Sequence, residues 1–597
     1  MNTRLQILAG QLPPGIDCAL LQSGPHHRYY LDFTCSYGIL LLAREDALFL
    51  TDARYIEVAR ETIRGCEVAL QEDTPAQVRA FLARNGAEAV ALDPGSATLG
   101  TVDWARELTG REPVASEALG ELLRSQRMEK DSEELSRISR AHSIAATVLE
   151  QIHGALHPGM TETEIQRELG ILAAQAGSQL ASFDFPVRRD GGHPLLTSQE
   201  PLTEEDILAL QVRAAWRGYQ VELVQSLSLG DNPDCGADKP LAGGNTPGFA
   251  AEHGGSGGMT LEQLRAERVA LLQGQLEPRT AFLLTGSQSM AYYFGGAEGK
   301  MALITADGTA VIGPAHSGDS LTVLARAAAE QHLRILEVEH DQISLSICEA
   351  LRRLLPCDLV VDGGLDAAIR AQMARKSPEE IGWIQEAQDI TDRVFQACIG
   401  EIRAGMTDWD IQLLVGVLFH DFGSQALSFD HVMGVGTATS HPHVRPSGRV
   451  LERGDLIMLD IGATVNGCGS DMTRMLALGE PDSEKREVYE IVRAAQAAGL
   501  AAAKAGVSCC QVDKAARAVI EAAGYGPCFC HGLGHSIGVG PRFTKYDDTP
   551  LAPGMVMTVE PGIYLPGRFG IRLEDMIHIR EHDTVNMTHS THELIVL

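Results

Sequence analysis

The sequence of 597 residues lacks any uncharged apolar run of about 18 residues, the length at which a helix spans a bilayer. Its start, MNTRLQILAGQLPPG, lacks the basic start, continuous apolar core and small-residue cleavage site of a secretory signal peptide. These absences predict a cytoplasmic protein with no membrane span. The twelve cysteines are then expected to be reduced, and their spacing contains no pair of CxxC motifs for a structural zinc site.

Basic clusters are also absent, and the formal net charge is -30 at pH 7. A chain of this charge repels phosphate backbones, so nucleic acid is not an expected partner. Small substrates fit this charge better. Apolar residues make up 44% of the sequence and charged residues 21%, close to the averages of globular proteins, which favours a soluble enzyme. The length predicts several domains.

An internal duplication organises the chain. KDSEE at Lys130 recurs as KSPEE at Lys376, and GMT at Gly159 recurs at Gly405, both at an offset of 246 (376 − 130). After a small insertion, residues 206–231 match residues 455–480. The first copy stops there, whereas the second continues to the end of the sequence. We therefore expect five segments, which are mixed α/β domains at 1–126 and 259–375, a truncated copy at 127–231, a Gly/Pro-rich linker at 232–258 and a complete copy at 376–597.

The duplicated segments share local signals for helices and strands. In each copy a helix is expected to begin at a capping box, at Asp131 and at Ser377, and a second helix at Thr161 and at Thr407. Apolar residues at helical spacing predict the buried face of the first helix, namely Leu135, Ile138, Ala145, Leu149, Ile152 and Leu156. In the second copy, LIMLDIGATV and CGSDMTRMLAL predict the two strands of a hairpin.

Five residues of the second copy suggest a metal site, namely Asp460, Asp471, His535, Glu560 and Glu574. Taken singly, each has an ordinary interpretation as a solvated or turn residue. Together, four carboxylates and one imidazole suit Mn²⁺, Co²⁺ or Fe²⁺ better than a structural zinc ion. With bridging carboxylates, such a set holds two divalent ions about 3.5–4 Å apart and a nucleophilic hydroxide between them.

The motifs that contain these residues, HGLGHSIG, MTVEPGIY and GIRLEDM, resemble in order those of the pita-bread metallopeptidases, the family of aminopeptidase P, prolidase and creatinase. The resemblance spans residues 376–597 and implies an α+β chain with a carboxy-terminal pita-bread fold. LFLTDARYIEVARE at residues 48–61 resembles the creatinase-type α/β amino-terminal domain that precedes this fold, and 259–375 is expected to be a second such domain. Metal-free creatinase lacks the five ligands, so the resemblance implies a metallopeptidase.

The resemblance also implies the substrate, the metal and the assembly. We expect an Xaa-Pro aminopeptidase or dipeptidase that acts on short proline-containing peptides, with the hydroxide attacking the scissile carbonyl. Two divalent ions per chain are expected, manganese foremost, with cobalt, iron or zinc as alternatives. A homodimer is the family's usual assembly.

Roles carry over to individual positions in the same way. Asp460, Asp471 and Glu574 would hold one ion, and Asp471, His535, Glu560 and Glu574 the other. Glu560 would also act as general base or proton shuttle.

Four further residues would face the substrate. His443 would contact it and stabilise the oxyanion, His531 would line the pocket, and Arg542 would pair with a terminal carboxylate of a dipeptide. Arg572 matches a family arginine, with an ion pair that orients Glu574 as the alternative interpretation.

Two departures from the family pattern leave a second hypothesis open. GHSIGVGPR is four residues shorter than the family's GHxIGxxxHExPR and lacks its second histidine, which Arg542 or His531 would have to replace. In the first copy, Gln211, Glu222 and Leu195 stand where Asp460, Asp471 and His443 do, so this copy cannot hold two cations and is expected to be a structural remnant. The alternative function is therefore a catalytically impaired relative that binds a peptide or a partner.

Overall fold

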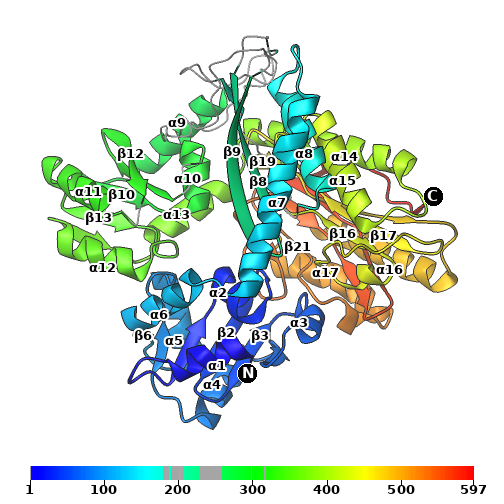
Figure 1. Ribbon diagram of the computed structural model, residues 1–597. Helices are drawn as coiled ribbons and strands as arrows, with labels where there is room; N and C mark the ends of the chain where they lie inside the picture. The colour runs from blue at the N-terminus through cyan, green and yellow to red at the C-terminus, as the bar shows by residue number, and fades with distance from the viewer. Residues whose placement is uncertain are drawn as a thin grey trace. The chain divides into compact units, whose positions relative to one another are not determined.

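The computed structural model describes residues 2–178, 187–189, 201, 203, 207–228, 259–296, 299–314 and 317–597 (Figure 1). The chain forms two compact units, one of Met1–Glu129 with Ser256–Met373 and one of Lys130–Gly255 with Ala374–Leu597. Each unit therefore combines a segment from each half of the duplication. The predicted linker at 232–258 lies outside the described residues. No helix in the described part of the chain is long and apolar enough to cross a bilayer.

The first unit opens with a six-stranded mixed sheet in the order β4-β3-β2-β1-β5-β6. Its strands are β1 Cys18–Leu21, β2 Gly38–Ala43, β3 Ala47–Thr51, β4 Glu67–Leu70, β5 Val90–Leu92 and β6 Val114–Ala115. Its helices are α1 Thr3–Gly10, α2 Gly24–Leu31, α3 Ile56–Thr62, α4 Thr74–Arg84, α5 Leu99–Thr109 and α6 Glu117–Met128. Successive residues of β1 and β2 enter two different apolar clusters, as alternation across a sheet requires, so both faces are covered.

A second, five-stranded sheet in the same unit has the order β12-β11-β10-β13-β14, which repeats this topology without a counterpart of β4. Its strands are β10 Thr280–Leu284, β11 Lys300–Thr305, β12 Gly308–Pro314, β13 Ile335–Val338 and β14 Asp358–Val360, and its helices are α9 Leu261–Gln273, α10 Ser287–Phe294, α11 Gly318–Glu330, α12 Leu345–Leu354 and α13 Gly364–Ala374. A pair of perpendicular tyrosines follows the first strand of each sheet, Tyr29–Tyr30 and Tyr292–Tyr293, both with ring centroids 4.9 Å apart. The two α/β domains are thus copies of one fold.

The second unit contains the truncated copy, built from α7 Ser132–Ala155, α8 Glu162–Gln175 and the antiparallel strands β7 Val187–Arg189, β8 Ile207–Trp216 and β9 Tyr219–Ser228. The capping box at Asp131 is confirmed as the start of α7, which packs on β8 and β9. The prediction that Leu135 is buried is wrong, because its side chain is 53% exposed. Its neighbour Glu134 points inward instead and accepts a hydrogen bond from the Tyr219 hydroxyl (2.8 Å).

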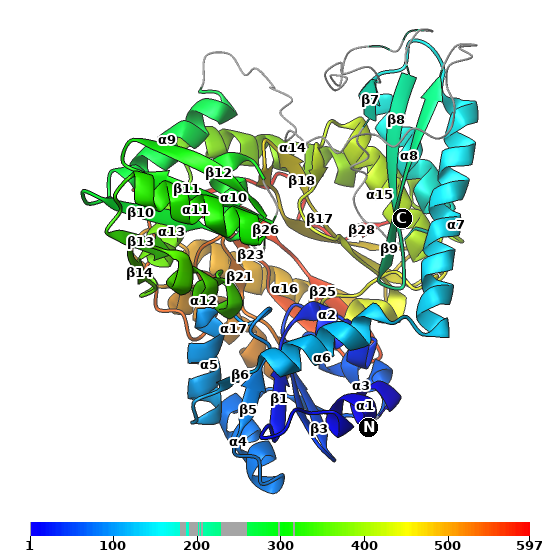
Figure 2. The same ribbon diagram turned by 60° about the vertical axis from the view of Figure 1, so that its left-hand side comes forward.

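The complete copy begins with the same elements, α14 Pro378–Glu401, α15 Asp408–Asp421, β16 Val432–Val435, β17 Leu456–Ile461, β18 Ala463–Val465, β19 Cys468–Gly469 and β20 Met472–Ala477 (Figure 2). The bounds of α14 and α15 equal those of α7 and α8 shifted by 246 residues (378 − 132). The second lobe adds α16 Ser483–Ala502, α17 Cys509–Ala522, β21 Gly534–His535, β22 Arg542–Phe543, β23 Val556–Val559, β24 Gly562–Leu565, β25 Phe569–Arg572, β26 Asp575–Ile579 and β27 Thr584–Asn586. An apolar cluster joins β17 and β20 to α16, α17 and the strands of the second lobe, which fixes the two lobes against each other.

Candidate metal centre

The five predicted metal ligands come from strands that meet between the lobes. Asp460 lies in β17, opposite Thr473 of β20, and Asp471 immediately precedes β20. His535 ends β21, which pairs with β22. The other two follow β23 and β25, and their backbone amides are fixed by hydrogen bonds from Glu560 to Leu533 O (2.8 Å) and from Glu574 to Thr473 O (3.2 Å).

The side chains of these residues converge. Asp471, His535 and Glu574 each offer a ligand atom within 4.8 Å of the others. His535 Nε2 lies 3.5 Å from Asp471 Oδ2 and 3.6 Å from Glu560 Oε1. Asp460 Oδ1 is buried and has no hydrogen-bond partner among the described residues. The structure therefore brings all five predicted ligands to one place.

Burial of several carboxylates in one space perturbs their ionisation. Burial raises the pKa of Asp460 to about 6, although the Arg572 guanidinium opposes the shift. Burial, with the charges of the neighbouring carboxylates added, raises the pKa values of Asp471 and Glu574 well above their usual range. Divalent cations would relieve this repulsion, and an unpaired buried oxygen such as Asp460 Oδ1 suits a hard ion. The donor set thus fits the divalent ions predicted from the sequence.

Arg572 holds two of the ligand carboxylates in place through hydrogen bonds, one directly and one through Thr473. It is 2% exposed, and its Nη2 donates to Asp460 Oδ2 at 2.5 Å. Its Nε donates to the Thr473 hydroxyl (2.9 Å), which in turn donates to Glu574 Oε2 (2.7 Å). The ion pair is therefore with Asp460, whereas the sequence suggested one with Glu574, which Arg572 reaches only through Thr473.

Tyr564 is a member of the site that sequence reasoning missed, although it ends the motif MTVEPGIY. Arg572 Nη1 donates to its hydroxyl (2.9 Å), and the same hydroxyl lies 2.9 Å from His531 Nε2. Burial raises the pKa of this phenol above its usual value. Tyr564 thus joins His531, predicted to line the pocket, to the arginine that holds Asp460.

Arg474, also not predicted, fixes the backbone of Glu574. The arginine is buried, pairs with Asp575 (2.7 Å) and donates to the Glu574 carbonyl oxygen (2.6 Å). A buried guanidinium held in this way restrains the strand from which the carboxylate projects.

The residues predicted to face the substrate lie around the ligands. His443 is exposed and follows Pro442, whose carbonyl oxygen accepts a hydrogen bond from Arg572 Nη1 (3.0 Å). Arg542 is exposed and is the cross-strand partner of His535. Because directly paired residues project to the same face of a ribbon, Arg542 lies beside a predicted metal ligand.

The shortened segment after His535 forms a tight reversal. Ser536 N–H donates to Pro541 O (3.0 Å), and a Cβ on Gly540 would overlap the Ser536 hydroxyl. The turn therefore closes directly between β21 and β22. It contains no histidine in place of the one that the family pattern carries there.

The first copy lacks this geometry for a local reason. Gly462 separates β17 from β18, and a Cβ there would overlap the carbonyl oxygen of Ser470 and the Ser428 hydroxyl. Arg213 occupies the corresponding position, where β8 and β9 run on as a continuous hairpin. Its guanidinium pairs with Glu222 across the hairpin (2.7 Å), with both side chains about half exposed. The one acidic residue retained there is thus part of a surface ion pair, and Leu195 lies outside the described residues.

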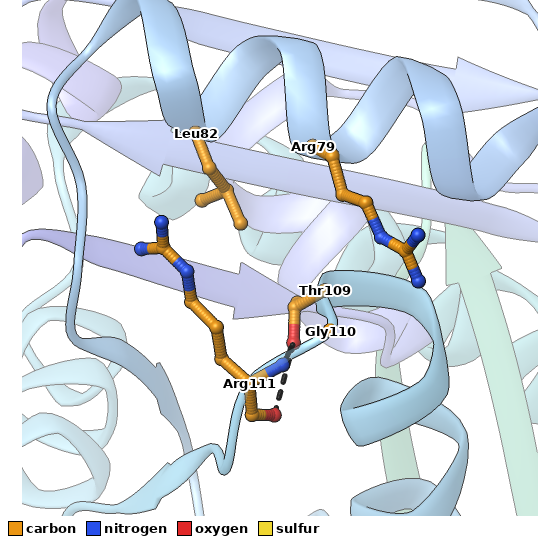
Figure 3. A pocket seen from close by; sticks show the side chains of 5 residues that line it. All are labelled: Arg79, Leu82, Thr109, Gly110 and Arg111. Carbon is orange, nitrogen blue, oxygen red and sulfur yellow. Dashed lines mark hydrogen bonds between the residues drawn. The ribbon is translucent and has the colours of Figure 1, made fainter.

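A cavity of about 370 Å³ in the first unit is lined by residues of other types than those of the metal centre (Figure 3). Arg79 and Leu82 of α4 line it together with Thr109, Gly110 and Arg111 at the end of α5. Arg79 donates to Glu107 O (2.7 Å), and Arg111 donates to Ala87 O. No carboxylate, histidine or cysteine is among the described residues that line it, so it offers no acid–base or ligand set.

A two-lobed fold with buried carboxylates and an imidazole between its lobes is the arrangement expected of a metal-dependent hydrolase. The sequence profile of metallopeptidase family M24 matches residues 136–238 and 382–581, and that of the creatinase/prolidase N-terminal domain matches residues 13–128. The chain belongs to metallopeptidase family M24, with the α+β pita-bread fold and a creatinase-type amino-terminal domain. Membership of this metallopeptidase family, together with the cluster of possible ligands, implies divalent metal ions.

Similar proteins are peptidases. A Xaa-Pro dipeptidase of Pyrococcus furiosus is 38% identical over 235 residues, which are 39% of this chain and 68% of that protein. Among solved structures, a Xaa-Pro dipeptidase from Bacillus anthracis has a TM-score of 0.52 at 31% identity, covering 56% of this chain and 100% of its own. An X-Pro aminopeptidase from Thermotoga maritima has a TM-score of 0.50 at 31% identity, covering 55% and 100%. A whole relative therefore corresponds to little more than half of this chain.

Proposed function

We propose that this metallopeptidase hydrolyses Xaa-Pro bonds in short peptides with two divalent ions, manganese foremost. The convergence of Asp460, Asp471, His535, Glu560 and Glu574 supports the dinuclear site. When bound, the ions supply an activated nucleophile and polarise the scissile carbonyl. The names of the relatives support the choice of an Xaa-Pro substrate.

The chain's own residues then position the substrate and move protons. Glu560 lies 3.6 Å from His535 at the edge of the carboxylate cluster, where it accepts a proton during attack and returns it to the leaving proline nitrogen. His443 donates a hydrogen bond to the substrate carbonyl region, and His531 lines the pocket with its ring nitrogens held by Gly532 O (2.7 Å) and the Tyr564 hydroxyl (2.9 Å). The chain of contacts from His531 through Tyr564 to Arg572 fixes the pocket against the ligand Asp460.

Among Xaa-Pro peptidases, the position of Arg542 favours a dipeptidase. Its exposed guanidinium is carried by the residue directly opposite His535, one strand spacing from the metal site. A dipeptide whose scissile bond lies at the ions would bring its terminal carboxylate within reach of this side chain. A forked guanidinium binds a carboxylate with two parallel hydrogen bonds.

A hydrolysis assay tests this proposal. The apo-protein is reloaded with Mn²⁺ and mixed with an Xaa-Pro dipeptide and with a longer Xaa-Pro peptide of the same first residue. We expect metal-dependent release from the dipeptide, loss of about 100-fold or more in kcat for Glu560→Gln, and mainly a raised KM for Arg542→Lys. Release from the longer peptide alone would favour an aminopeptidase, and no release from either would refute the proposal.

The second candidate is a catalytically impaired relative that binds a peptide or a partner. The observation that favours it is the tight turn after His535, which lacks the family's second histidine. It predicts metal uptake without turnover, measured by metal analysis and the same assay. Glu560→Gln would then change metal content but no measured rate.

Other expectations from the sequence stay proposals. They are the five-segment division with boundaries at 126, 231, 258 and 375, cytoplasmic residence, and the absence of nucleic-acid partners. The homodimer expected from the resemblance is considered next, because the duplicated elements offer a different arrangement.

A further inference from the structure

The two copies contact each other through equivalent residues. In the first unit, Thr98 and Ser344 form an antiparallel β-bridge, and they are the N-caps of α5 and α12. Their numbers differ by 246 (344 − 98), the same offset that relates α7 to α14. A residue that meets its own counterpart lies on or near a twofold axis between copies.

The contacts on either side of this bridge are reciprocal. Gly100 N–H donates to His340 O (3.3 Å), and Ser346 N–H donates to Pro94 O (3.2 Å). The donors of these two bonds differ by 246 (346 − 100), and so do their acceptors (340 − 94), so each bond is the counterpart of the other with the copies exchanged. Such exchange, in which residue i meets j and j meets i, defines an isologous interface.

The second unit repeats the pattern with different elements. Helix α8 of the truncated copy packs against α15 of the complete copy, and these helices are counterparts at the same offset. The contact is thus again between like elements. In each of the two units, considered alone, an element of the first copy contacts its counterpart from the second copy.

We propose that this chain is an internal pseudo-dimer, in which the first copy occupies the self-complementary faces of the second that would otherwise bind a second chain. The partner for these faces is a second copy of the same fold, supplied in cis. Because an isologous face is used once per pair, the chain is a monomer with a single metal centre. The lengths of the two proteins agree with a paired arrangement, since 56% of this chain matches the whole of the Bacillus anthracis dipeptidase.

A cross-link across the axis tests the pairing in the full-length protein. Leu345 N–H donates to Ala97 O beside the bridge, which makes Thr98 and Ser344 a non-hydrogen-bonded pair. Such pairs have Cα atoms about 4.5 Å apart, within the range that a disulfide spans. The double variant Thr98→Cys with Ser344→Cys is oxidised, run without reductant and mapped by mass spectrometry, with each single variant as control.

We expect a link between the two engineered cysteines within one chain, at the mobility of 64.1 kDa. A link between two chains in the double variant, absent from the single variants, would show that the pairing occurs in trans and would overturn the proposal. Failure of the double variant to cross-link, while correctly folded by circular dichroism, would also contradict it.

Sedimentation of the unaltered protein is the second measurement. From about 10 nM to 10 μM, we expect one species with the mass of a single chain and an activity per chain that does not change with dilution. A species of twice that mass would overturn the proposal, whatever the cross-link shows. Neither measurement depends on which peptide the protein cleaves, so failure here is distinct from failure of the proposed function.

Discussion

At the scale of single residues, Arg572 determines how the metal centre is held. Its five donors reach Asp460, Thr473, Pro442 and Tyr564, and a lysine could satisfy only some of them. We expect Arg572→Lys to weaken Mn²⁺ binding by about 10–100-fold, as measured by calorimetric titration.

The control for that variant is Arg568→Lys. Arg568 immediately precedes β25, which ends at Arg572, but its side chain is exposed and pairs with Glu484 at the surface. It should leave metal affinity unchanged. Equal affinities for both variants would show that Arg572 does not position Asp460.

His431, which contacts Gly462 in the hairpin of the metal site, gives the protein a pH-dependent stability. Burial lowers its pKa to about 4, and its Nε2 lies 3.2 Å from the Gly462 nitrogen and 3.1 Å from the Gly462 carbonyl oxygen. The unfolded chain, with a histidine pKa of about 6.5, binds more protons between these values. Stability is therefore fully present above about pH 6.5 and falls as the pH is lowered toward 4.

The expected contribution is about 2 kcal/mol of unfolding free energy lost between pH 7 and pH 5, measured by urea denaturation at both pH values. His431→Gln should reduce this difference while lowering stability at pH 7, because a glutamine does not titrate. An unchanged difference between the two pH values would contradict the assignment.

At the scale of secondary-structure elements, the break at Gly462 bends the hairpin that carries Asp460 and Asp471. A Cβ at position 462 would overlap Ser470 O and the Ser428 hydroxyl. Gly462→Ala must therefore displace the backbone at Gly462 or at Ser470. We expect a loss of about 2–4 kcal/mol in stability and weaker metal binding, measured by denaturation and titration. Gly382→Ala in α14 meets no atom within 4 Å and should be neutral or stabilising by up to about 1 kcal/mol.

Which elements the sequence could predict follows from the range of their interactions. The helix starts at Asp131, Ser377 and Thr407 are confirmed, because a capping box is formed within four residues. The hairpin strands of the second copy are confirmed for a similar reason, since short apolar runs broken by Gly and Asn are local signals. The bridge between Thr98 and Ser344 was not predicted, because it depends on how two domains pack.

The same distinction applies within the site. The five ligand candidates were found through short motifs, whereas many of the contacts that hold them join residues far apart in the sequence. Arg572 reaches Asp460 across 112 residues, and Tyr564 joins the site only through its hydroxyl partners. The burial of Leu135 was wrongly predicted, because helical spacing alone did not reveal that Glu134 takes the inward position.

At the scale of the whole molecule, the two units should respond differently to metal. All five ligand candidates belong to the unit of residues 130–255 and 374–597. We expect scanning calorimetry to show two transitions, of which Mn²⁺ raises only one, because a ligand stabilises the state that binds it. A single transition that shifts as a whole would show that the units unfold together.

The ion pair between Arg213 and Glu222 also has an evolutionary consequence. Arg213 stands where the complete copy needs Gly462, and the first copy also lacks the lobe that carries His535, Glu560 and Glu574, so reversing this position alone would restore no catalytic function. Each single step back would break a surface ion pair and gain no activity. Selection therefore has no gradual path to a second active site, and the loss of catalytic function in the first copy is not readily reversed.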